Sequence, residues 1–452
     1  MAQRTTRRPR SQPQTTGGAW LILGGVAAVG LVVGIVSFAA SGTADASGAL
    51  IVGPLLLLAT LPLLSRRAKR DGDPQLYRLL VVALLVKFIG AIIRYYVAYD
   101  VYGGVADAAG YHDAGVRIAE NFRSGVFATG LDSLSDTNFI RFLTGLVYSI
   151  IGNTGLGGFF VFAWLGFWGQ FFFYRAFRIA VPEGKSLHYA TLLFFLPSLV
   201  FWPSSIGKEA WMTFALGLAA LGAARLLMDR FWRGFAIAGV GMWLAALVRP
   251  HVAGLFALAL AVGYLVRPSR ASSRAFGPVT KAVGLTAVAV LAFLLVVRAD
   301  EFLERSAIET ESGVTAVLRE TSERTATGGS RFAPSILESP TRAPIAVATV
   351  LFRPFFFEVH NLQAALAAVE TTFVLGLCLF RIRWITSAVG SIRRQPYLAM
   401  ALAFSSLFIL AFSGFANFGL LARERVQLLP IFLALLCVPP GRDNDGERAS
   451  AG

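Results

Sequence analysis

A short stretch near residue 110 concentrates side chains that are capable of acid–base chemistry. The sequence "VADAAGYHDAG" holds Asp107, Tyr111, His112 and Asp113 within seven residues. On a helix, residues about four apart share a face, so Asp107, Tyr111 and His112 would lie roughly on one side. A carboxylate at such a place is a candidate base for a hydroxyl acceptor, or a ligand for a sugar. An ordinary solvated loop is the alternative.

A lysine and a glutamate follow a Pro-Ser-Ser turn inside a long apolar run, in "FWPSSIGKEAWMTF". Glu209 at a helix N-terminus is stabilised by the helix dipole, whereas Lys208 at the same end is unfavourable unless an anion lies nearby. Free backbone N–H groups together with a lysine form a site suited to phosphate. The alternative is that Lys208 only extends to the membrane interface.

An Arg-Pro-His turn joins two further apolar runs. Arg249 and His251 flank the proline, and the proline ring fixes the backbone and so aims both side chains. The turn is either part of a binding site or an anchor at the membrane interface.

The stretch "RPFFFEVHN" surrounds an aromatic run with Arg353, Glu358 and His360. Aromatic residues are typical at the level of the lipid headgroups, with or without a site. The combination of Arg, Glu and His in an apolar stretch favours a functional role, and Glu358 is a second candidate base.

Two arginines, Arg423 and Arg425, enter the last apolar run in "ANFGLLARERVQLLP". Glu424 alone cannot pair with both, and unpaired guanidinium groups close to hydrocarbon are unfavourable. Guanidinium groups match phosphate oxygens in geometry, so a multiply charged phosphate is the expected ligand. Structural pairing with Glu209 or Glu358 is the alternative.

The composition sets these residues in a membrane. Of 452 residues, 56% are hydrophobic and 15% are charged, and the mean hydropathy is +0.64, whereas soluble chains are roughly 25% charged. The net charge of +15 comes from basic residues in short loops, which indicates a positive-inside bias and not a nucleic-acid surface. The sequence therefore predicts an all-α, multi-pass integral membrane protein, with the lipid bilayer as a partner and no nucleic acid.

The apolar runs predict about 12 transmembrane helices, because about 20 apolar residues are needed to cross a bilayer. The predicted spans are 19–41, 48–64, 79–97, 156–176, 187–202, 209–227, 231–248, 251–266, 279–298, 361–380, 397–415 and 426–438. Two shorter runs, 139–152 and 343–352, are expected to be re-entrant or interfacial helices. The basic loops, such as 65–70 and 381–394, are then all cytoplasmic, as are both termini.

The expected organisation is a single transmembrane domain, 19–438, in the inner (cytoplasmic) membrane. Disordered cytoplasmic tails are expected at 1–18 and 439–452, and extracytoplasmic loops at 98–138 and 299–341. All the candidate site residues then fall on the extracytoplasmic side.

Motifs for nucleotides and metals are missing from the sequence. No P-loop, no GxGxxG after a strand, no HExxH, no Cys/His metal spacing and no GxSxG occurs in a credible context. We therefore expect no cofactor and no metal, and any group donor would have to reach the outer leaflet without a nucleotide.

The stretches "DAAGYH", "LPSLVFWPSSIGKEA", "RPH", "LFRPFFFEVHN" and "NFGLLARERVQLLP" together resemble two groups of polytopic proteins of bacterial surface-polysaccharide biosynthesis. These are the Wzy-like O-antigen and exopolysaccharide polymerases and, more loosely, the GT-C glycosyltransferases. The resemblance covers about residues 80 to 435. It implies a cell-envelope protein that takes a polyprenyl-(di)phosphate-linked sugar donor and a glycan acceptor.

The resemblance also implies roles for individual residues. GT-C enzymes have a catalytic acid in the first external loop, which Asp107 matches. Wzy-like enzymes have external arginines that bind the polyprenyl diphosphate, and the candidates by position are Arg249, Arg353, Arg423 and Arg425.

The leading hypothesis is a metal-independent glycosyltransferase or glycan polymerase. The candidate catalytic residues are Asp107, His112 and Glu358. The candidate substrate-binding residues are Tyr111, Lys208, Glu209, Arg249, His251, Arg353, His360, Arg423 and Arg425. A transporter or flippase for a lipid-linked or anionic solute, and a membrane scaffold, are the alternatives.

Overall fold

The computed structural model describes residues 16–39, 44–228, 231–268, 322, 340–359 and 361–440, whose regular secondary structure is helical, with no strand among them. The first half of the chain forms α1 (Thr16–Ala39), α2 (Ala44–Asp71), α3 (Pro74–Tyr96), η1 (Val97–Val101), α4 (Asp107–Arg123), α5 (Asp136–Ile151), α6 (Gly155–Ala180), α7 (Ser186–Phe195), α8 (Pro197–Phe201) and η2 (Trp202–Ser204). The second half forms α9 (Lys208–Leu227), α10 (Phe231–Ala246), α11 (Pro250–Val266), η4 (Pro340–Arg342), α14 (Ala343–Phe352), η5 (Phe356–Glu358), α15 (Leu362–Phe380), α16 (Ile382–Gly390), α17 (Pro396–Phe412) and α18 (Phe418–Leu435).

Several helices are long and apolar enough to cross a membrane, as a multi-pass membrane protein requires. In the described part of the chain there are five, namely Leu50–Asp71, Pro74–Val101, Gly155–Ala180, Lys208–Leu227 and Leu362–Phe380, and six if the bent pair α7 and α8–η2 counts as one span. The predicted all-α class is confirmed. The predicted spans fall mainly on helices, with 187–202 divided between α7 and α8, except for 279–298, which lies outside the described residues.

Both runs expected to be re-entrant or interfacial are helices in the structure. The run 343–352 is α14, and its 10 residues reach only about 15 Å against a hydrocarbon thickness of about 30 Å. The run 139–152 is α5. The expected external loop 98–138 is itself largely helical, since η1 and α4 lie within it. Most of the second expected loop, 299–341, lies outside the described residues.

Polar residues fix where several helices begin. The side chain of Asp73 accepts a hydrogen bond from Leu76 N ahead of α3, and Asn417 accepts from Gly419 N and Leu420 N ahead of α18. Such N-caps satisfy backbone N–H groups that have no partner inside the helix. The start of α18 matters most, because it sets the rotation of the helix that carries Arg423 and Arg425.

The centre of the bundle is α9, which packs between α6 and α10 through small residues. A Cβ atom on Gly217 of α9 would lie 2.2 Å from the backbone oxygen of Gly169 in α6, and one on Gly241 of α10 would lie 2.3 Å from the backbone nitrogen of Ala219. Contacts this close require glycine, as is common between membrane helices. The backbone of α9 is therefore held rigidly, and so is its first turn, which bears Lys208 and Glu209.

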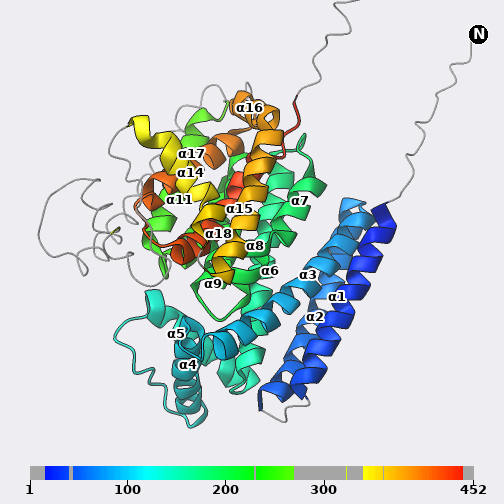
Figure 1. Cartoon of the computed structure of the whole chain (residues 1–452), viewed down its shortest axis with the longest axis vertical. Helices are drawn as coiled ribbons and strands as arrows, with labels where there is room; N and C mark the ends of the chain where they lie inside the picture. Colours follow the sequence, from blue (N-terminus) through cyan, green and yellow to red (C-terminus); the bar gives the residue numbers. More distant parts are fainter. Residues whose placement is uncertain are drawn as a thin grey trace, which may run out of the picture.

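Basic loops meet at one end of the molecule. Asp71 at the end of α2 accepts hydrogen bonds from Arg67, Arg175 and Arg178 at 2.8, 2.9 and 2.9 Å. Arg381 next to α16 donates to Leu436 O at 3.0 Å. Figure 1 shows α16 at the end of the molecule opposite α4 and α5. One end of the bundle, near α16, is therefore rich in basic residues. The other end, near α4 and α5, holds most of the candidate site residues.

Candidate functional site

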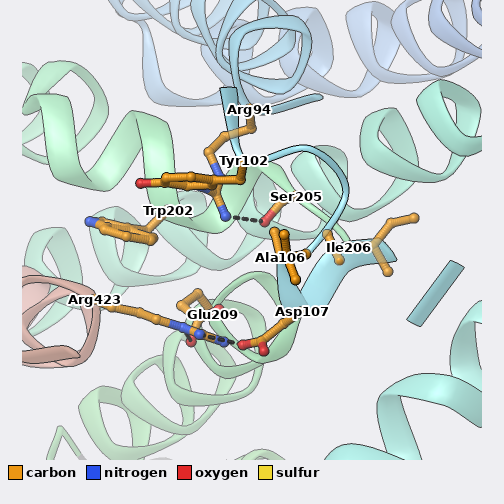
Figure 2. Close-up of a pocket in the computed structure, with 11 residues that line it drawn as sticks. Arg94, Tyr102, Ala106, Asp107, Trp202, Ser205, Ile206, Glu209 and Arg423 are labelled. Atoms are coloured by element: carbon orange, nitrogen blue, oxygen red, sulfur yellow. Dashed lines mark hydrogen bonds and ion pairs between the residues drawn. The ribbon is translucent and has the colours of Figure 1, made fainter. Parts of the chain in front are cut away.

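A cavity of about 360 Å³ opens where α3, η1 and α4 face α9 and α18. Its polar and aromatic lining is shown in Figure 2 and consists of Arg94, Tyr102, Asp107, Trp202, Ser205, Glu209 and Arg423. Three of these, Asp107, Glu209 and Arg423, were candidates from the sequence. Residues from distant parts of the chain therefore do converge on one cavity.

A chain of alternating charges begins at the cavity lining and continues into the protein beyond it. Glu209, only 3% exposed, accepts hydrogen bonds through Oε1 from Arg423 Nε at 2.6 Å and from Arg249 Nη2 at 3.1 Å. Arg423 Nη1 also donates to Asp107 Oδ2 at 2.6 Å, and Arg249 Nη2 to Glu424 Oε1 at 2.6 Å. Each buried guanidinium thus bridges two carboxylates, which is the condition under which buried charges are tolerated.

The helices bring these side chains together by their N-terminal ends. Asp107 is the first residue of α4, Glu209 lies in the first turn of α9, and Arg249 is the N-cap of α11 with Pro250 in the first helical position. Helix N-termini carry partial positive charge and favour carboxylates or anionic ligands. The first turns of α4 and α9 therefore stabilise Asp107 and Glu209, and they add positive potential to the site.

Lys208 points to a different partner from its neighbour Glu209. Its Nζ donates to Asp136 Oδ1 at 2.5 Å, which ties α9 to the start of α5. Lys208 does not line the cavity. The anion that the sequence required near Lys208 is therefore a side chain of this protein.

Arg353, Glu358 and Arg425 form a second, separate cluster at the end of α14. Arg353 Nε donates to the Glu358 carboxylate at 2.8 and 3.1 Å, and Glu358 also accepts from Phe355 N at 2.9 Å. Arg425 donates from Nε to Val350 O at 2.7 Å, and from Nη2 to Arg353 O. The cluster satisfies carbonyls at the C-terminal end of α14, where a cation is favoured. None of the three lines the cavity, and His360 lies outside the described residues.

The remaining candidates, His112, His251 and Tyr111, do not line the cavity. His112 Nδ1 is 2.7 Å from the hydroxyl oxygen of Tyr148 in α5, and its ring packs against Tyr99. His251 packs against Phe412, with ring centroids 6.2 Å apart. Tyr111 is 4% exposed, and burial, with a smaller contribution from the carboxylates of Asp107 and Glu209, raises the pKa of its phenol to about 12.

Arg94 of α3 is the main site residue that the sequence reasoning missed. Its guanidinium carbon lies 4.6 Å from the Phe201 ring centroid and 5.0 Å from that of Trp202, and Nη2 is 3.4 Å from Ser205 Oγ. Its Nε is buried without a hydrogen-bond partner, and no carboxylate of the described residues lies within 4.0 Å of the guanidinium. The available signal was an arginine inside a predicted span, which is a functional hint by itself.

The cavity thus combines a partly exposed carboxylate, a cation held on aromatic rings and a network of paired charges. Such a set can bind an anionic group and accept a proton beside it. Within the described part of the chain, no group of three or more His, Cys, Asp or Glu side chains is arranged to hold a metal ion.

The fold and cavity define a multi-pass membrane protein with a charged site between its helix ends. No known protein family, curated protein or solved structure matches the chain, so the function rests on this site.

Proposed function

We propose that the protein is a membrane-embedded glycosyltransferase or glycan polymerase of bacterial cell-surface polysaccharide assembly, of the Wzy-like or GT-C-like kind. Its donor is a polyprenyl-phosphate- or polyprenyl-diphosphate-linked sugar, and its acceptor is a glycan hydroxyl. One observation carries the proposal: Asp107 and Arg94 line the same cavity (Figure 2). Asp107 offers an accessible carboxylate, and Arg94 offers a cation with no carboxylate of the described residues within ion-pair distance.

In this proposal the reaction breaks the bond between the sugar anomeric carbon and the phosphate oxygen. Asp107, whose side chain is 60% exposed, accepts the proton of the acceptor hydroxyl as that oxygen bonds to the anomeric carbon. The departing phosphate gains negative charge, and Arg94 stabilises it. Arg423 orients the Asp107 carboxylate through its 2.6 Å hydrogen bond. The paired arginines elsewhere provide structure.

The proposed topology has twelve spans, both termini in the cytoplasm and the cavity at the extracytoplasmic face of the cytoplasmic membrane. The support is the difference between the two ends of the bundle. The basic loops around Asp71 and Arg381 meet at one end, and α4 and the cavity lie at the other. Positively charged loops favour the cytoplasmic side.

A carrier for a lipid-linked or anionic solute is a second candidate. It is favoured by a broken span, since α7 and the α8–η2 segment are bent by 62° at Leu196. Discontinuous helices often form substrate sites in transporters. Reconstitution in liposomes with a labelled polyprenyl-linked sugar separates the two, because an enzyme makes a glycosidic product, whereas a carrier moves the label without forming a bond.

The same assay tests the enzyme directly with Asp107→Asn. Loss of a general base typically lowers the rate by ~10²- to 10⁴-fold. Asp113→Asn is the matched control, because Asp113 lies on the same helix, is exposed and does not line the cavity. Product formation by Asp107→Asn at the wild-type rate would reject the assigned base.

A further inference from the structure

Two prolines leave two backbone carbonyls without their usual partners. In an α-helix each N–H donates to the carbonyl four residues earlier, and proline has no N–H. In "FFLPSLVFWPSS", Pro197 and Pro203 therefore leave the carbonyls of Leu193 and Leu199 unsatisfied. This is the segment in which α7 ends and α8 begins, bent by 62°.

Buried polar side chains from two other helices occupy both positions. Gln170 Nε2 of α6 donates to Leu193 O at 3.0 Å and to Leu199 O at 2.9 Å. Lys87 Nζ of α3 donates to Leu199 O at 2.7 Å. Both side chains are 1% exposed, so neither is placed there for contact with solvent.

A carboxylate from a third helix also binds the backbone of this short helix. Glu370 Oε2 of α15 accepts a hydrogen bond from Ser198 N at 2.6 Å, and Glu370 is 8% exposed. The Glu370 carboxylate accepts from an N–H of α8 and the Lys87 ammonium donates to a carbonyl of α8, as the peptide dipoles favour. Helix α8 is therefore held between opposite charges from α3 and α15.

Glycines let the neighbouring helices approach the segment closely. A Cβ atom on Gly166 of α6 would lie 2.4 Å from Pro203 O, and one on Gly90 of α3 would lie 3.0 Å from Val200 Cγ1. The next residues of the segment, Trp202 and Ser205, line the cavity and contact Arg94. A straight apolar helix would avoid burying these charges, but it would not direct Trp202 and Ser205 to Arg94.

We propose that Lys87, Gln170 and Glu370 are positioning residues that hold α8 in the orientation in which Trp202 and Ser205 meet Arg94. They act through the backbone of α8 and touch no substrate. The inference rests on the proposed function only for its activity readout, because the position of Ser205 is measurable without any substrate.

The test uses a Ser205→Cys reporter in purified full-length protein in which Cys378 and Cys437 are replaced by alanine. The rate at which a charged thiol reagent modifies the new thiol reports how residue 205 is presented to the cavity. We expect Lys87→Met and Glu370→Leu to change that rate at least threefold. We expect Glu370→Gln to stay near the parent rate, because the amide oxygen still accepts from Ser198 N.

Ser405→Ala is the control for loss of a buried polar group, since among the described residues the Ser405 hydroxyl bonds to Ala401 O in its own helix. If the Lys87→Met protein does not accumulate, Gly166→Ala is tested in its place. The added methyl group displaces Pro203 away from α6. Unchanged labelling in Glu370→Leu together with Lys87→Met or Gly166→Ala overturns the inference.

The activity arm keeps Ser205 in place and measures transfer from the lipid-linked sugar. Because Arg94 stabilises the departing phosphate in the proposed mechanism, a positioning role predicts that Glu370→Leu lowers kcat, with recovery in Glu370→Gln. An unchanged kcat in Glu370→Leu, or an equal loss of kcat in Glu370→Gln, overturns this role. If the protein transfers no sugar at all, the proposed function fails, whereas the labelling result still decides the role of α8.

Discussion

Arg423 and Asp107, which are 316 residues apart in the sequence, are joined by a 2.6 Å hydrogen bond at the mouth of the cavity. The pair ties α18 to the first turn of α4, and Arg423 reaches the buried Glu209 through its other donor. An extracytoplasmic acid in the proposed mechanism is therefore oriented by a helix from the far end of the chain. Disturbing this bond should affect both stability and chemistry.

Arg423→Gln should lower stability and abolish product formation. The change leaves Glu209 with one guanidinium partner and Asp107 without its orienting donor, and breaking a buried ion pair costs about 3–5 kcal/mol. A thermal unfolding scan and the liposome transfer assay measure the two effects. Arg393→Gln removes an exposed charge near α16 and should change neither. Wild-type activity in Arg423→Gln would contradict the proposed role.

Arg94→Met should separate function from stability. Arg94 is a buried cation without a carboxylate partner among the described residues, so replacing it with an apolar side chain of similar length relieves a desolvation cost. We expect an unchanged or higher unfolding temperature and a loss of transfer activity of about 100-fold, of the size seen for groups that stabilise transition-state charge.

The matched variants for Arg94 are Arg94→Lys and Arg117→Gln. Lysine keeps the charge and should retain part of the activity. Arg117 is exposed on α4 and does not line the cavity, so its loss should have little effect. If Arg94→Met unfolds at a markedly lower temperature, Arg94 has a structural role and the assignment is wrong.

The sequence predicted the helical class and some of the site for one physical reason: charges inside apolar runs need partners or a function. That argument identified Asp107, Glu209 and Arg423, which the cavity unites. It named Glu209 as an alternative partner for the last arginines, and Arg423 does pair with Glu209. It could not predict the Lys208–Asp136 pair, which depends on how helices far apart in sequence rotate against each other. Arg94 was missed because it continues an otherwise apolar helix.

The broken span formed by α7 and α8 is also only partly predictable from the sequence. The prolines at 197 and 203 indicate a break in the helix. The side chains that satisfy the freed carbonyls, Lys87 and Gln170, come from two other helices and have no local signature. Local chemistry predicts the break, and only tertiary packing supplies its partners.

Arg425→Met should act mainly on stability. Arg425 is 4% exposed and donates to the carbonyls of Val350 and Arg353, and carbonyls left buried without a donor cost about 1–3 kcal/mol. We expect a lower unfolding temperature, with activity per folded molecule reduced far less than in Arg94→Met. The assay compares equal amounts of monodisperse protein after size exclusion. A total loss of activity at an unchanged unfolding temperature would instead place Arg425 in the binding site.

A double-mutant cycle on Lys208 and Asp136 should show a coupling of about 1 kcal/mol or less. The two side chains are 18% and 33% exposed, and solvent screens partly exposed pairs. Asp136→Asn is the suitable change, because Asp136 has a φ of 53° and asparagine tolerates that region better than most residues. Lys208→Met removes the cation without shortening the side chain. Chemical unfolding of the two single variants and the double variant gives the coupling.

Because neither Lys208 nor Asp136 lines the cavity, the KM for the donor should change little in all three variants. A large rise in KM in Lys208→Met alone would show that Lys208 contacts the donor after all.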